Sequence, residues 1–270
     1  MSTASSFVHD LRVMATATGV SVTNTFRAVP LWLWLIQLFA LAVFPMAFFV
    51  LLVGSGIGSS VDVGYVALGN ALFSVVFASV YSVCAVPGTE KHAGTLPQLM
   101  NTPTRLFTVF IGLSLFEIIT ALLSAAISLS FAASLSWIDL SAVNVASFVS
   151  VIIVTTISMA GFGLMLSSIG LFLRSASVLA SLAVYVTMIL CGADFPVSYL
   201  PASVQVVSYC IPITYGLQAL REAAVGGGLE QIASLLIVML AIGLVLYMLA
   251  FFAFSRFEMI ARTKGAIEVF

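Results

Sequence analysis

Residues 86–105 read VPGTEKHAGTLPQLMNTPTR and separate two long apolar runs, residues 63–86 and 106–135. Each run exceeds the roughly 20 apolar residues that a helix needs to cross the hydrocarbon core of a bilayer. Charged residues make up only 7% of the chain, yet this connection gathers several ionisable side chains. They are Glu90, Lys91, His92 and Arg105. The stretch is therefore predicted to be a charged connection between two membrane-spanning helices.

The composition of the whole chain agrees with this class of protein. Hydrophobic residues make up 62% of the 270 residues, and the mean hydropathy is +1.23. A water-soluble domain could not hide so much apolar surface, so the chain is predicted to be an all-α integral membrane protein. The polar stretches are too short for a soluble domain of their own, so residues 1–270 are expected to form a single transmembrane domain. Nine Lys and Arg scattered along the chain argue against nucleic-acid binding.

Six apolar segments are expected to span the membrane. They are residues 31–53, 63–86, 106–135, 145–173, 176–191 and 232–254. The preceding residues 2–29 carry apolar side chains on one helical face, which indicates an interfacial helix. Residues 192–228 contain Pro196, Pro201 and Pro212 but are too apolar for an exposed loop, which favours partly re-entrant short helices.

The distribution of Lys and Arg predicts the orientation, because cytoplasmic loops are enriched in these residues. If six spans alternate, eight of the nine basic residues fall on one side. These are Arg12, Arg27, Lys91, Arg105, Arg174, Arg256, Arg262 and Lys264, whereas Arg221 lies opposite. Both termini and residues 86–105 are therefore predicted to be cytoplasmic, and residues 192–228 to face outward.

Polar and aromatic side chains recur on single faces of two predicted spans. Asn70, Phe77 and Tyr81 share a face of the second span, and Ser181 and Tyr185 share a face of the fifth. Such stripes usually pack against another helix and less often face a cavity. Both interpretations stay open for these five candidate cavity residues.

Isolated ionisable residues supply a further candidate. Glu117 lies about 18 Å along the third span from Arg105, near mid-bilayer, where acids are costly and often functional. A hydrogen-bonded packing role is the alternative for this side chain. Arg221 and Glu222 lie near the outer surface, where a solvated structural role is favoured over lipid binding or pairing with Asp194.

Neither the cysteines nor the first residues indicate a metal site or a secretory signal. Cys84, Cys191 and Cys210 lack the spacing of metal ligands. Cys191 and Cys210 flank the outer stretch and could pair, although separate reduced thiols are favoured. The first 28 residues lack a central apolar core, so no cleavable signal peptide is expected.

The charged connection also resembles a known motif. Glu90 followed by Gly94-Thr95-Leu96, then a Leu and Thr-Pro, is similar to the loop between the second and third spans of ABC-2-type permeases. The resemblance implies a short coupling helix that docks on a separate ATPase. The candidate coupling residues are Glu90, Lys91, Gly94, Thr95 and Leu96. Many relatives carry an acid where this chain has Pro97, and proline fits only the first turn, so a helix should begin near Leu96.

A second match lies at the other end of the chain. Residues 192–201, followed by Pro212-Ile-Thr-Tyr215 and Arg221, resemble the outer signature of the same family. The resemblance implies an outer gate, while a simple proline-shaped bend is the alternative. The candidate gate residues are Phe195, Pro196, Leu200 and Pro201.

Together the two matches imply a permease subunit of the plasma (inner) membrane, similar to those of daunorubicin-type drug exporters and polysaccharide exporters. Neither Lys91 nor Lys264 lies in a Gly-x-x-x-x-Gly-Lys-Ser/Thr phosphate loop, so ATP and Mg are expected on a partner ATPase, with no cofactor on this chain. The expected partners are that ATPase, a second permease as homodimer or heterodimer, and membrane lipid. The implied cargo is hydrophobic or amphipathic: a drug-like molecule, an antibiotic or a lipid-linked glycan.

Two other functions remain open from the sequence alone. A proton-coupled secondary transporter would use Glu117 as its carrier, but the sequence shows neither a paired intramembrane ionisable group nor an evident inverted repeat. A non-transporting membrane scaffold would use the charged connection only to dock a cytoplasmic partner.

Overall fold

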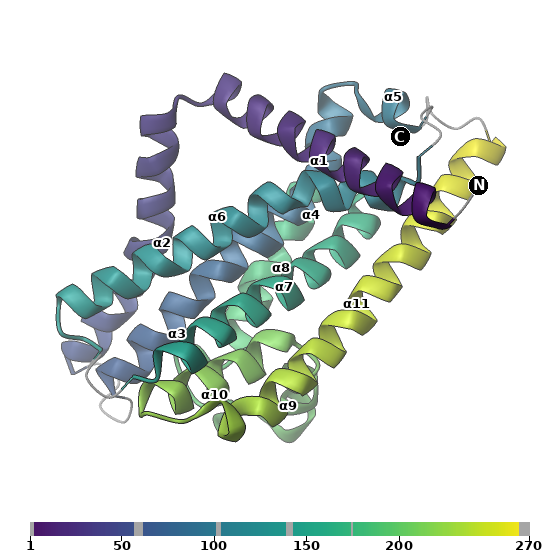
Figure 1. Ribbon diagram of the computed structural model, residues 1–270. Coiled ribbons are helices and arrows are strands. Elements are labelled where there is room, and N and C mark those ends of the chain that lie inside the picture. Colours follow the sequence, from purple (N-terminus) through teal and green to yellow (C-terminus); the bar gives the residue numbers. More distant parts are fainter. Residues whose placement is uncertain (1–2, 57–61, 101–103, 139–142, 174, 265–270) are drawn as a thin grey trace.

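The computed structural model describes residues 3–56, 62–100, 104–138, 143–173 and 175–264. Every regular element in these ranges is helical, and the long helices form a tilted bundle (Figure 1), which confirms the all-α prediction for the described part. Asp139, Arg174 and the Thr102-Pro103 step of the charged connection lie outside the described residues.

The elements follow one another with short connections. In chain order they are α1 (Thr3–Ala28), α2 (Leu31–Gly54), α3 (Val63–Val76), η1 (Phe77–Tyr81), α4 (Ser82–His92), α5 (Leu96–Met100), α6 (Leu106–Ser134), α7 (Val145–Gly170), α8 (Ala176–Leu190), η2 (Val197–Tyr199), α9 (Ala202–Tyr209), α10 (Pro212–Ala224) and α11 (Leu229–Lys264). The elements α3, η1 and α4 run without a break as one helix, called here the Val63–His92 helix.

Among the described residues, five helices are long and apolar enough to cross a membrane. They are α2, the Val63–His92 helix, α6, α7 and the Leu229–Ala261 part of α11. The expected fifth span, α8, has only 15 residues and a length of about 22 Å, less than a hydrocarbon core of about 30 Å. Length and composition therefore support five of the six expected spans.

The Val63–His92 helix runs six residues beyond its expected end. A proline inside a helix removes one backbone hydrogen bond, so Pro87 should favour a break. Pro87 is buried, however, and a Cβ placed on Gly88 would lie 3.2 Å from the Cβ of Ala176. Packing of α4 against α7 and α8 thus outweighs the local preference, and Glu90 and Lys91 become the last turn of the helix.

Close helix contacts hold α7 between α4, α10 and α11. A Cβ placed on Gly163 would lie 3.0 Å from the Cβ of Val83, and one on Gly161 would lie 2.8 Å from the ring of Tyr247. The Tyr247 hydroxyl donates a hydrogen bond of 3.0 Å to the carbonyl of Ile157. Small residues therefore permit the backbone approach on which membrane helix packing depends.

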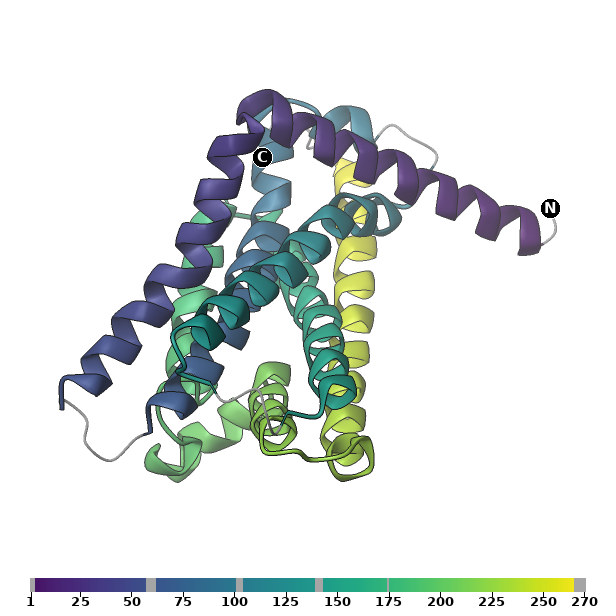
Figure 2. The ribbon, with the colours of Figure 1, turned by 60° about the vertical axis from the view of Figure 1, so that its left-hand side comes forward.

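The expected helix before the first span is present as α1, which lies across one end of the bundle (Figure 2). It packs on α6, where the Thr18 hydroxyl donates a hydrogen bond of 2.8 Å to the carbonyl of Gly112. A Cβ on Gly112 would lie only 2.7 Å from the carbonyl oxygen of Met14. The absence of a side chain on Gly112 therefore allows α1 to rest on the α6 backbone.

The two ends of the bundle differ in their short elements. The start of α1, helix α5 and the end of α11 lie at one end, and α9 and α10 lie at the other (Figures 1 and 2). Residues 192–228 form short helices, as expected, and the inner face of α10 is fully covered. Ile213, Leu217 and Leu220 are buried there, against α7, α11 and α3. This burial explains why the stretch is too apolar for an exposed loop.

Candidate functional site

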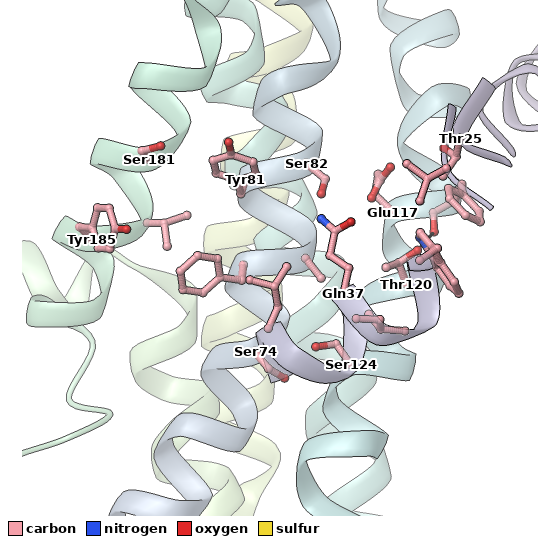
Figure 3. A pocket seen from close by; sticks show the side chains of 18 residues that line it. Thr25, Gln37, Ser74, Tyr81, Ser82, Glu117, Thr120, Ser124, Ser181 and Tyr185 are labelled. Atoms are coloured by element: carbon pink, nitrogen blue, oxygen red, sulfur yellow. Dashed lines mark hydrogen bonds between the residues drawn. The ribbon is translucent and has the colours of Figure 1, made fainter. Parts of the chain in front are cut away.

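A cavity of about 500 Å³ opens between the end of α1, α2, the Val63–His92 helix, α6 and α8 (Figure 3). Its volume falls within the roughly 300–1,000 Å³ that is usual for small-molecule sites. Its wall combines aliphatic and aromatic side chains with hydroxyl groups, an amide and a carboxyl group. Such a surface suits a mostly apolar ligand that carries a few polar atoms.

Five of the six candidate cavity residues line this space. They are Phe77, Tyr81, Glu117, Ser181 and Tyr185. Asn70 does not: its side chain is 3% exposed, and its Nδ2 donates a hydrogen bond of 2.7 Å to Oδ1 of Asp194. Asn70 and Phe77 share a helical face but are seven residues apart, about 10 Å along the axis, so they lie at different depths.

Other lining residues escaped the sequence analysis. Gln37 reaches the cavity from α2, Ser82 from α4 and Thr120 from α6, and the Gln37 amide, Ser82 and Glu117 point toward one another (Figure 3). Gln37 is the one amide in an otherwise apolar first span, and that isolation is the signal that could have found it. Ser82 gave no signal, because the serines of a membrane helix occur on every face.

Glu117 lies about two fifths of the way along α6, and its carboxyl group faces the Ser82 side chain (Figure 3). The residues that line the cavity include no Lys, Arg or His. An ionised carboxylate here therefore has no basic partner in the cavity wall.

A π-helical turn shapes the same wall. The element η1 interrupts the α-helical pattern of the Val63–His92 helix, and its first and last residues, Phe77 and Tyr81, both line the cavity. Single π-helical turns widen a helix locally and occur frequently at functional sites. The turn therefore lies in the cavity wall, and the charged end of the same helix follows it in α4.

The five candidate coupling residues meet in one tight turn at that charged end. Gly94 has a φ of +69°, a left-handed conformation that glycine adopts without strain. The Thr95 amide donates a hydrogen bond of 3.1 Å to the carbonyl of Glu90, and the Gly94 amide donates one of 3.2 Å to the carbonyl of Lys91. This pair of bonds is the Schellman arrangement that ends many α-helices.

Side chains reinforce the same turn. The Thr95 hydroxyl donates a hydrogen bond to the Glu90 carboxylate. Leu96 is buried in the same apolar cluster as Leu106 and Val109, and it begins α5 with Pro97 in the first turn, as the sequence predicts. Glu90, Thr95 and Leu96 therefore fix the geometry between the end of α4 and the short helix α5.

The candidate gate residues lie at the opposite end of the bundle. Pro196 directly precedes η2 and Pro201 directly precedes α9, each in extended conformation, so their lack of an amide proton leaves the helices intact. Phe195 and Leu200 are half-buried, whereas Pro201 is exposed. The two prolines thus turn the chain between α8 and α9, as expected.

The expectation that Arg221 is a solvated residue near the surface is wrong. Its guanidinium carbon lies 3.3 Å from the centroid of the Tyr65 ring, and its Nη2 donates hydrogen bonds of 2.9 Å to the carbonyl of Gly192 and 3.2 Å to that of Ala193. Helix α10 begins at Pro212 and carries Arg221 one turn after Leu217, on its buried face. The helical register therefore turns the charge inward.

The segment after α8 rests directly on the Val63–His92 helix. A Cβ placed on Gly69 would lie 2.1 Å from the carbonyl oxygen of Ala193, so only glycine fits. Burial raises the pKa of the Asp194 carboxyl above its ordinary value, and this is opposed by the hydrogen bond from Asn70 and by the charge of Arg221. Asn70, Tyr65, Asp194 and Arg221 thus form one cluster, called here the outer clamp.

The three cysteines are free thiols, which confirms the favoured prediction. Cys84 and Cys191 are buried, whereas Cys210 is exposed. A disulfide between Cys191 and Cys210 is therefore not part of the fold.

The long apolar helices and the cavity between them define a multi-pass membrane protein. Residues 14–225 match the family model described as ABC-2 type transporter, and the chain belongs to this family. The matched domain is a membrane permease that lacks a nucleotide-binding site, and such permeases generally pair with an ABC ATPase. No curated protein sequence matches the chain.

Proposed function

We propose that the chain is the permease subunit of an ATP-driven exporter in the plasma (inner) membrane. It moves a hydrophobic or amphipathic compound out of the cytoplasm, and a separate ATPase with bound ATP and Mg supplies the energy. The observation that carries this proposal is the cavity of about 500 Å³, which brings together five residues of the predicted second, third and fifth spans. Drug-like molecules, antibiotics and lipid-linked glycans have the required chemistry.

The proposed topology has six spans, with the short helix α8 as the fifth. Both termini and α5 face the cytoplasm, and α9 and α10 face outward. The grouping of α5 with the described chain ends, opposite α9 and α10, supports this arrangement (Figure 1). A helix of 15 residues can be accommodated where the bilayer thins or where protein covers its ends.

Coupling runs through the Val63–His92 helix in this proposal. Its cytoplasmic end carries Glu90 and the Gly94 turn, its middle carries the π-helical turn at the cavity, and its outer start contacts the segment after α8. An ATPase that pushes on α5 therefore moves a helix that borders both the cavity and the outer clamp. Glu90, Lys91, Gly94, Thr95 and Leu96 form or support the docking surface.

The outer gate is the bend between α8 and α9. Phe195 and Leu200 present apolar side chains beside two prolines, and the outer clamp ties the start of this bend to α10. Because an aromatic ring has few rotamers, Phe195 closes an opening at a small cost in conformational entropy.

A second permease subunit completes the path. One face of α8 exposes an apolar stripe at helical spacing, which continues into the cavity at Tyr185. Its residues are Val178, Leu182, Tyr185, Val186 and Ile189. A second copy of the chain, or a related permease, covers this stripe and closes the cavity on its open side.

Membership of the ABC-2 family argues against the two alternative functions. A proton-coupled transporter needs no ATPase, and Glu117 finds no basic partner in the cavity wall. A pure scaffold has no need of a cavity of ligand size.

Affinity purification of the tagged chain from its native membranes tests the proposal. The expected result is a co-purifying ATPase with a phosphate-loop lysine, whose hydrolysis rate responds to hydrophobic compounds. Wild-type protein should be compared with Gly94→Val, which strains the turn at Gly94. The control variant is Gln98→Ala, which alters an exposed side chain on α5. Recovery of the wild-type chain without any ATPase would contradict the proposal.

A further inference from the structure

The charge of the cavity has one sign only. Among the 18 residues that line it, Glu117 is the single Asp or Glu, and none is Lys, Arg or His. A carboxylate held among apolar groups without a cationic partner is costly, because the low dielectric strengthens any unbalanced charge. A ligand that brings a positive charge removes this imbalance, whereas an anionic ligand increases it.

The position of Glu117 suits such a contact. Its carboxyl group points from α6 into the space between α2 and the Val63–His92 helix (Figure 3). The Ser82 hydroxyl faces the carboxyl group (Figure 3), whose oxygen lone pairs can accept hydrogen bonds from a ligand. The Gln37 amide faces it from α2 (Figure 3). The carboxylate is therefore accessible from the cavity.

Aromatic rings form much of the remaining wall. Trp34, Phe77, Tyr81, Phe116 and Tyr185 line the cavity. Trp34 and Phe116 stack with ring centroids 6.0 Å apart and an interplanar angle of 28°. The faces of such rings attract cations, and indole attracts them most strongly. Aromatic faces and one carboxylate together recognise a positive charge that is embedded in an apolar body.

A bare metal ion does not fit this donor set. The described residues hold no group of three or more His, Cys, Asp and Glu side chains that could bind one. The cavity is also far larger than an ion site, and its volume matches that of an organic molecule.

We propose that Glu117 selects the charge of the ligand and that the cavity prefers lipophilic organic monocations of drug size. The inference rests on the proposed function, since it assigns the cavity to cargo. It narrows the cargo from hydrophobic compounds in general to those with one positive charge shielded by apolar groups.

Two isosteric probes of opposite charge test this. Tetraphenylphosphonium and tetraphenylborate have the same shape, so a difference in binding reports charge. The full-length chain, purified in the assembly that it forms and placed in nanodiscs of zwitterionic lipid, is dialysed against each probe, with empty nanodiscs subtracted. The wild type should bind the cation at least tenfold more tightly than the anion. Glu117→Gln should lose at least tenfold in cation affinity, because a desolvated charge pair is worth more than this.

A relocated carboxylate separates charge selection from packing. The double variant Glu117→Gln/Gln37→Glu moves the acid to the facing wall of the same cavity and should restore most of the preference for the cation. The variant Glu117→Asp should keep this preference. Ile119→Val, at an exposed position of α6 that does not line the cavity, should leave it unchanged.

Wild-type protein that binds tetraphenylborate as tightly as tetraphenylphosphonium overturns the inference, and so does a Glu117→Gln variant that keeps the preference. Neither result affects the proposed export function, because binding is measured without ATP and does not depend on transport. ATP-driven transport of a neutral dye would then still support export.

Discussion

The guanidinium group of Arg221 lies 3.3 Å from the centroid of the Tyr65 ring and joins α10 to the first turn of the Val63–His92 helix. The same guanidinium holds the carbonyls of Gly192 and Ala193, so three separate segments meet at one side chain. Charge-assisted hydrogen bonds and a cation–π contact reinforce each other in this geometry. The outer clamp therefore fixes the segment that leads into the proposed gate.

Replacement of Arg221 by Met should destabilise the fold. The substitution leaves buried carbonyl groups without their donor, at an expected cost of about 2–3 kcal/mol in the free energy of unfolding. Arg221→Lys should recover only part of this, because an ammonium group cannot reproduce the planar fork. Thermal unfolding of the purified protein measures the effect, with the exposed Glu222→Gln as control. Equal midpoints for Arg221→Met and Glu222→Gln would exclude a structural clamp.

The close contact between Gly69 and Ala193 predicts a second effect on stability. Gly69→Ala places a methyl group 2.1 Å from the Ala193 carbonyl oxygen, so the segment after α8 must shift. The expected cost is about 1–3 kcal/mol, the range for overpacked sites. Gly19→Ala is a matched control in a helix, since no atom lies within 4 Å of its added Cβ, and it should be neutral or slightly stabilising. If both variants unfold at the wild-type temperature, the proposed close contact between Gly69 and the Ala193 carbonyl oxygen is contradicted.

The turn at Gly94 should be required for transport but not for insertion. Gly94→Val forces a β-branched residue into a left-handed conformation, at a cost on the order of 1–3 kcal/mol, and so displaces α5 from the end of α4. Glu90→Ala should have a similar but weaker effect, because it removes the acceptor for Thr95. Both variants should reach wild-type levels in the membrane and lose most ATP-dependent transport. Normal transport by Gly94→Val would rule out coupling through this turn.

Accessibility of introduced cysteines should report the proposed topology. In a variant without the native cysteines, Tyr199→Cys should react with an impermeant maleimide added to intact cells, since Tyr199 is 64% exposed near the outer end. A cysteine that replaces Gly265 should react only after the cells are permeabilised. Labelling of position 265 from outside would refute cytoplasmic termini.

Phe195→Ala should affect the proposed gate without affecting expression. Loss of the ring beside Pro196 opens the bend, so transport rate or passive leak should change, whereas binding of cargo from the cytoplasmic side should change little. Rates measured for several cargoes in the same vesicles provide the comparison. Identical transport rates and identical leak for wild type and Phe195→Ala would rule out a gating role, and the segment would then be only a structural bend.

Much of the fold follows from the sequence, because long apolar runs and prolines act locally. The apolar runs predict α2, α6 and α7 closely, and each proline before a helix marks its start, as Pro30 does for α2 and Pro201 for α9. Pro97 correctly placed the start of α5 at Leu96. These features depend on a few neighbouring residues and on bilayer thickness.

The remaining features depend on contacts between distant segments, which periodicity does not report. The helix continues through Pro87 because α4 packs against α7 and α8. Arg221 turns inward because carbonyls from residues 28 and 29 positions earlier lie within its reach. Helical periodicity groups Asn70 with Phe77 on one face. Asn70 lies at a different depth in the bundle, where it donates a hydrogen bond to Asp194 in the outer clamp. Each of these three features becomes visible only in the tertiary structure.

Transport into everted membrane vesicles tests the central claim most directly, namely that a separate ATPase drives export through this chain. Vesicles that contain the chain and its co-purifying ATPase are given ATP and a panel of cationic, neutral and anionic hydrophobic dyes. At least one dye should accumulate with ATP, resist a protonophore, and fail to accumulate with Gly94→Val or when the phosphate-loop lysine of the ATPase is replaced. Accumulation that persists without the ATPase, or that collapses with the protonophore, would contradict the account.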